Sequence, residues 1–184
     1  MRNYADDLAG LAARYSPKPI VIGWSMGGLV ALMVASGGLA SACVGLAPSA
    51  PARLQDETVS LRNGVFDSQE YGIVSRDPSR QPAMPDLDEE ERTIALSSLG
   101  LESRLARDER KRGIVVGALP CPLLIVTAEW ETERQRATYT ELGLAADYHS
   151  VDACSHWGLV LNRRALAHLV PVVASWMSET RGHR

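Results

Sequence analysis

Apolar and amphipathic stretches alternate along most of this 184-residue chain. Short apolar runs predict buried β-strands at residues 20–22, 41–46 and 122–127, and residues 147–151 are predicted to form a fourth strand. Apolar residues at helical spacing predict helices at residues 4–15, 29–35, 133–142 and 163–177. We expect Pro171 to kink or divide the last helix and residues 178–184 to fray. Strands that alternate with helices in this way predict an α/β fold, a parallel sheet with flanking helices.

Residues 52–119 interrupt this alternation. The segment is polar, charged and poor in strand signals, and it is too long for a plain loop. Its proline-rich part precedes three acidic residues, Glu89 to Glu91, which favour the start of a helix. A second helix is predicted over residues 101–111, where mixed charges are typical of a solvated face. We therefore expect one domain, residues 1–184, with residues 52–119 as an insertion.

Residues 23–27 read Gly-Trp-Ser-Met-Gly and lie between a predicted strand and a predicted helix. The pattern G-x-S-x-G in this context is typical of a nucleophile elbow, a sharp turn that exposes a serine, here Ser25. Glycines are expected because such a turn leaves no room for a Cβ on either side of the serine. The alternatives are a glycine-rich turn with a bystander serine, or a nucleotide-binding loop. The glycine patterns of nucleotide-binding loops are absent from the chain.

Composition excludes several classes of partner. With a net charge of −3 and a pI of about 5.8, the chain has no feature of a protein that binds nucleic acid or an anionic membrane surface. No signal peptide or membrane span is predicted, and we expect a cytoplasmic protein. Cys43, Cys121 and Cys154 are widely spaced, which predicts reduced thiols rather than disulfides or a zinc site. No metal or other cofactor is expected.

A nucleophilic serine needs a general base, and the base needs an acid that orients it. Of the four histidines, only His156 lies in a loop after the last predicted strand, at the sheet edge where sites of open α/β sheets form. The acid should follow the third strand at the same edge. Glu131 is our first choice there, and Glu129 and Asp152 remain open as alternatives.

These residues resemble the α/β-hydrolase superfamily, of the bacterial serine esterase type, in its order of serine, acid and histidine. The resemblance rests on residues 23–28, 122–131 and 155–157, with Ala128 and Ser155 where the family usually has glycine. It implies a serine hydrolase that cleaves an ester-like acyl group of a small molecule, with Ser25, His156 and Glu131 as the triad. The backbone N–H of Met26 would hold the oxyanion, and residues 52–119 would be the cap or lid. Three tryptophans flank the triad positions and could line an acyl pocket: Trp24, Trp130 and Trp157.

The start of the chain departs from the family pattern. Family members carry about four strands before the helix that opens this chain, and one of their loops gives the second oxyanion donor. Only 22 residues precede Gly23, which suggests a shortened product, pairing with another chain, or a weak remnant. The apolar edge at residues 20–22 predicts self-association into a homo-oligomer. The alternative function is a catalytically weak or inactive binding or assembly module.

Overall fold

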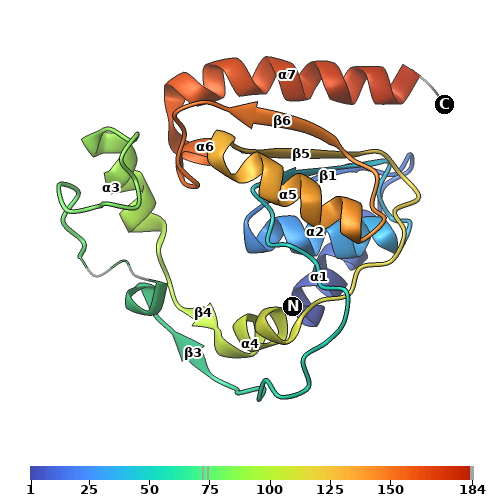
Figure 1. The fold of residues 1–184 in the computed structure, drawn as a ribbon, viewed down its shortest axis with the longest axis horizontal. Helices are drawn as coiled ribbons and strands as arrows, with labels where there is room; N and C mark the ends of the chain where they lie inside the picture. Colours follow the sequence, from blue (N-terminus) through green and yellow to red (C-terminus); the bar gives the residue numbers. More distant parts are fainter. Residues whose placement is uncertain (72, 74, 183–184) are drawn as a thin grey trace.

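A four-stranded parallel sheet forms the centre of the protein (Figure 1). The computed structural model describes residues 1–71, 73 and 75–182. The strand order is β1-β2-β5-β6. The strands are β1 (Ile20–Trp24), β2 (Ala42–Leu46), β5 (Leu123–Ala128) and β6 (Asp147–Val151). The predicted α/β fold with a parallel sheet is confirmed.

β5 shows why the apolar runs become central strands. All six of its residues are buried, and successive side chains point to opposite faces of the sheet. Leu123 and Ile125 pack into one apolar cluster, whereas Leu124 and Val126 pack into another. A strand with helices on both faces therefore reads as a continuous apolar run.

Helices cover both faces of the sheet (Figure 1). One face packs against α1 (Arg2–Ala12), α2 (Met26–Ser36) and α5 (Glu129–Glu141), and the other against α6 (Gly158–Leu161) and α7 (Arg163–Gly182). Most of α2 is buried, because it is apolar on all sides.

Two helix predictions were wrong. α5 begins directly after β5 at Glu129 rather than at residue 133, so the predicted acidic loop is the first turn of a helix. Acidic residues are favourable there because they face the positive end of the helix dipole. α7 runs through Pro171 without division and reaches Gly182, so residues 178–182 are helical rather than frayed. Residues 183 and 184, with His183, lie outside the described residues.

The chain between β2 and β5 contains further short elements. They are β3 (Val65–Phe66), the 3₁₀ turn η1 (Ser68–Tyr71), α3 (Glu89–Ser98), β4 (Glu102–Ser103) and α4 (Arg104–Arg112). β3 and β4 form a small antiparallel pair that the sequence did not predict. A capping box starts α3: Asp88 Oδ1 accepts a hydrogen bond from the N–H of Glu91, and Glu91 Oε2 accepts one from the N–H of Asp88. Its apolar residues pack against Trp157 and Leu161, so this segment contacts the loop after β6.

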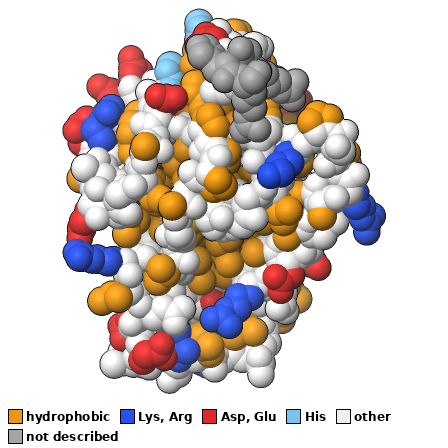
Figure 2. All heavy atoms as spheres, turned by 90° about the vertical axis from the view of Figure 1, so that its right-hand side faces the viewer, with side chains coloured by type: hydrophobic (Ala, Val, Ile, Leu, Met, Phe, Trp, Pro, Cys, Tyr) orange, Lys and Arg blue, Asp and Glu red, His pale blue; other side chains and the backbone are white. Residues whose placement is uncertain are grey.

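β1 is one of the two outer strands of the described sheet, and β6 is the other. Val21 is buried beneath the helices, whereas the Ile22 side chain is 52% exposed. Self-association along this edge stays a prediction. Figure 2 shows the side on which the strands begin, where apolar side chains spread across the middle and charged groups lie mostly towards the periphery. Among the described residues, no helix combines the length and the hydropathy that a bilayer span needs.

Candidate active site

Ser25 occupies a strained turn between β1 and α2. Its backbone has φ 53° and ψ −121°, a conformation that costs a residue with a side chain about 1–3 kcal/mol. Two backbone hydrogen bonds tie it to the end of β2 and the chain beyond: the N–H of Ser25 donates to Leu46 O at 2.9 Å, and the N–H of Ser49 donates to Ser25 O at 2.8 Å. Within the turn, Ser25 O also accepts from the N–H groups of Gly28 and Leu29. The end of β2 and the chain that follows it thus fix the turn that carries the serine.

Close backbone contacts explain two of the three glycines around the serine. A Cβ on Gly23 would lie 2.2 Å from the carbonyl oxygen of Gly27, and a Cβ on Gly28 would lie 2.6 Å from Pro48 Cβ. Gly27 differs, because a Cβ there would meet nothing within 4 Å. The expectation that neither side of the serine has room for a Cβ is therefore wrong for Gly27.

Met26 is the first residue of α2 and lies directly after the serine. Among the described residues, its N–H has no backbone acceptor, as is usual for the first N–H groups of a helix. The helix dipole adds partial positive charge at this point. This N–H can donate to an oxygen that develops negative charge beside Ser25.

Trp24 joins the serine's strand to the loop of His156. Its indole Nε1 donates to the carbonyl oxygen of His156 at 3.0 Å. The ring centroids of Trp24 and His156 lie 5.1 Å apart. The ring of Trp157 also packs against Trp24, with 4.9 Å between the ring centroids. The loop after β6 is thereby attached next to Ser25.

The surroundings of His156 favour the neutral form of its imidazole. Burial lowers the pKa of its imidazole below the usual 6.5, and the positive charge of Arg110 lowers it further. Only a neutral imidazole can accept a proton, so these effects favour a general base at and below neutral pH.

Glu131 carries a buried carboxyl group in the first turn of α5. Its residue is 7% exposed, and its Oε1 accepts a hydrogen bond from Arg134 at 3.0 Å. Oε2 is buried without a hydrogen-bond partner. Burial raises the pKa of this carboxyl, and the charge of Arg134 opposes that change. An unused buried acceptor is costly, and a donor such as an imidazole N–H would satisfy it.

Two cavities share Ser25, Arg110 and His156. One, of about 430 Å³, has a polar lining that includes Glu131, Arg134 and Gln135. The other, of about 400 Å³, has largely apolar walls. The structure thus brings Ser25, His156 and Glu131 to one cavity, although no hydrogen bond links these three side chains in the described part of the chain. The predicted pocket residues Trp24 and Trp157 line the apolar cavity, as does Met26.

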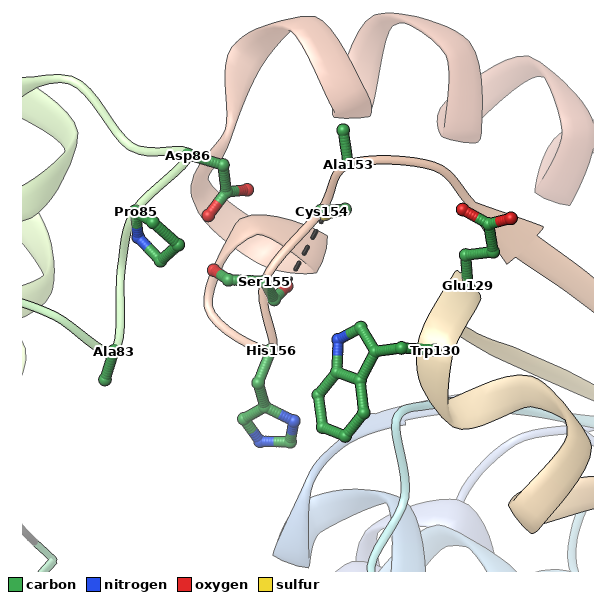
Figure 3. Close-up of a pocket in the computed structure, with 9 residues that line it drawn as sticks. All are labelled: Ala83, Pro85, Asp86, Glu129, Trp130, Ala153, Cys154, Ser155 and His156. Carbon is green, nitrogen blue, oxygen red and sulfur yellow. Dashed lines mark hydrogen bonds between the residues drawn. The ribbon is translucent and has the colours of Figure 1, made fainter.

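The alternative acids lie elsewhere. A third cavity, of about 660 Å³, borders His156 but does not include Ser25. Glu129 lines this cavity, and Figure 3 shows that its carboxylate points away from the imidazole of His156. The exposed side chain of Trp130 lies beside that imidazole. Asp152 is exposed and lines a further cavity that also lacks Ser25.

Sequence reasoning missed Arg110. Its helix α4 was interpreted as a solvated face, yet Arg110 lines both cavities that contain Ser25. No spacing in the sequence marks it, because it comes from a helix far from Ser25 and His156 along the chain. Cys154 is close to His156, but burial and the neighbouring Asp86 raise its pKa to about 12, which disfavours a nucleophilic thiolate. Within residues 1–71, 73 and 75–182, no cluster of His, Cys, Asp or Glu side chains could hold a metal ion.

Comparison with known proteins shows the family to which the chain belongs. It belongs to the alpha/beta hydrolase family, whose sequence model matches residues 2–169. The resemblance drawn from the sequence is confirmed. No curated protein sequence matches the chain at a significant level.

Solved structures share the fold at low identity. Polyneuridine aldehyde esterase has a TM-score of 0.61 and 13% identity, over 94% of this chain and 79% of that one. A variant of tomato methylketone synthase I with β-ketoheptanoate has a TM-score of 0.61 and 16% identity, over 93% and 76%. The alpha/beta hydrolase GrgF from Penicillium sp. sh18 has a TM-score of 0.57 and 15% identity, over 99% and 72%.

We predict that Gly23→Ala lowers the free energy of unfolding by about 1–3 kcal/mol or more, because its Cβ would overlap the backbone of Gly27. Gly27→Ala is the matched control. It should be neutral or stabilise the helix by up to about 1 kcal/mol, since its Cβ meets open space. Urea denaturation measures both, and equal midpoints for the two variants would contradict the packing described here.

We also predict that His156 titrates below pH 6.5 and that Arg110→Gln raises its pKa. The sign follows because a nearby positive charge disfavours the imidazolium, so its removal favours protonation. NMR of histidine-labelled protein measures this, with the His156 signal assigned by its loss in His156→Gln. An unchanged pKa in Arg110→Gln would show that the guanidinium does not act on the imidazole.

Proposed function

We propose that this protein is a serine hydrolase that cleaves ester-like acyl substrates through Ser25, His156 and Glu131. The observation that carries the proposal is the meeting of these side chains, from the ends of three different strands, in one cavity. The strained turn at Ser25 adds support, because it exposes the hydroxyl at the edge of the sheet. One fold neighbour is named an esterase, and we extend that chemistry to this chain as part of the proposal.

The reaction would proceed in two halves. Ser25 Oγ attacks the ester carbonyl carbon while His156 accepts the hydroxyl proton. The bond to the alcohol oxygen then breaks, and His156 returns the proton to that oxygen as the alcohol leaves. In the second half, water attacks the acyl-serine through the same base, which releases the acid and restores Ser25.

Glu131 would accept a hydrogen bond from the other imidazole nitrogen of His156. This interaction would fix the tautomer and stabilise the imidazolium that forms in each half. Its unpaired Oε2 has the acceptor capacity for this role. The N–H of Met26 would hold the carbonyl oxygen as it becomes an oxyanion.

The competing function is a catalytically weak or inactive module that binds or assembles. The observation that favours it is the absence of hydrogen bonds among the three side chains in the described structure. Catalytic hydrogen bonds are often long without substrate, so this geometry is also compatible with the proposed triad.

We predict that a fluorophosphonate probe labels the native chain and that Ser25→Ala and His156→Ala abolish labelling. His168→Ala is the matched control, because His168 is exposed on α7, away from the cavities that contain Ser25. Gel fluorescence after labelling measures all four proteins, with circular dichroism to show that each is folded. A folded native chain that stays unlabelled would favour the binding module.

We predict further that Glu131→Gln lowers kcat about 10²–10⁴-fold, because an amide can hold the imidazole in the wrong tautomer. Glu129→Gln should leave kcat unchanged, since its carboxylate points away from His156 (Figure 3). Hydrolysis of a p-nitrophenyl ester measures both. A larger loss in Glu129→Gln would reverse the assignment of the acid.

A further inference from the structure

Arg110 is the cationic side chain that both cavities at Ser25 share. It comes from α4, in the insertion, and is half-buried. The apolar cavity also contains Arg107 and Glu102, and the polar cavity also contains Arg134. The position of Arg110 beside both the nucleophile and the base distinguishes it from the other two arginines.

The charge of Arg110 lacks a carboxylate partner within the described part of the chain. Its Nη1 donates to Ser49 Oγ at 3.2 Å, and that hydroxyl is neutral. The other arginines of these cavities are paired: Arg107 contacts Glu70 at 2.9 Å and Arg134 contacts Glu131 at 3.0 Å. A half-buried, unpaired guanidinium retains most of its donors for a ligand.

The hydrogen bond to Ser49 orients this guanidinium. Ser49, its hydrogen-bond partner, also donates its own N–H to the carbonyl oxygen of Ser25. The guanidinium is therefore linked to the nucleophile through a single residue. An anion bound by Arg110 would lie close to the reacting carbonyl, and it would also offset the positive charge that acts on His156.

We propose that Arg110 binds a carboxylate that the substrate carries near its scissile ester bond. This inference rests on the proposed hydrolase function and names the substrate class of that site. A guanidinium recognises a carboxylate through two parallel hydrogen bonds, which gives both affinity and orientation. Because Arg110 lines both cavities, the carboxylate can belong to the acyl part or to the alcohol part of the ester.

Paired esters test the proposal and separate these two sources. Monoethyl glutarate against ethyl hexanoate places the charge on the acyl side, and 3-(butanoyloxy)propanoate against butyl butanoate places it on the alcohol side. The native chain should prefer the charged member of at least one pair. In Arg110→Gln the ratio of kcat/KM, charged over neutral, should fall about 10- to 100-fold. Arg110→Lys should retain part of the preference, because the charge remains without the planar fork.

Lys111→Gln is the matched control, because it removes one positive charge from an exposed position on the same helix. It should leave the ratio of the charged to the neutral ester unchanged. A native chain without preference for either charged ester would overturn the inference. A ratio that stays constant while Arg110→Gln slows both members equally would also overturn it, since Arg110 would then act on the common oxyanion.

A binding measurement separates failure of this inference from failure of the hydrolase function. Ser25→Ala cannot form an acyl-enzyme, so calorimetric titration with the two charged esters measures their binding alone. Binding should weaken about 10- to 100-fold when Arg110→Gln is added to Ser25→Ala. If no ester is cleaved and no serine is labelled, the proposed function fails, yet Arg110-dependent binding would still support the carboxylate site. Equal binding of the charged esters by Ser25→Ala with and without Arg110→Gln would overturn the carboxylate site.

Discussion

The backbone of Ser25 is the constraint on which the rest of the site depends. A positive φ at a residue with a side chain persists only where the surroundings hold it. Here β2 and Ser49 hold it through hydrogen bonds, and the glycines at 23 and 28 allow the chain to approach itself and Pro48 at distances that no Cβ would permit. The sheet, the apolar helix α2 and the chain after β2 are all arranged around this one turn.

Helix α4 adds a positive charge to the candidate site. The ends of β1, β5 and β6 bring the proposed nucleophile, acid and base to one cavity, whereas Arg110 comes from α4 and lines both cavities that contain Ser25. Under the two proposals above, an arginine that lowers the pKa of the base and also binds the substrate's carboxylate would couple substrate recognition to the protonation state of the base. When the substrate binds, its negative charge would partly offset the effect of Arg110 on the pKa of His156.

The sequence predicted the parts of this arrangement that local rules determine. Strand β5 could be found because burial on both faces requires an unbroken apolar run, and Ser25 could be found because a strained turn requires glycine at 23. The start of α5 was missed, since a glutamate suits an exposed loop as well as the first turn of a helix, where Glu129 and Glu131 lie. The position of Arg110 could not be predicted. Nothing in the sequence of a charged helix shows which of its side chains lies near a serine far away along the chain. Self-association and the division into domain and insertion stay predictions.

Under the proposed function, Trp24 would affect the entropy of catalysis. Its indole holds the backbone of His156 and packs on the imidazole ring, one residue away from Ser25. Under the proposed function, the orientational freedom of the base would therefore be reduced once, when the chain folds, rather than at every turnover. A single bulky residue thus attaches the loop of His156 to the strand that leads to Ser25.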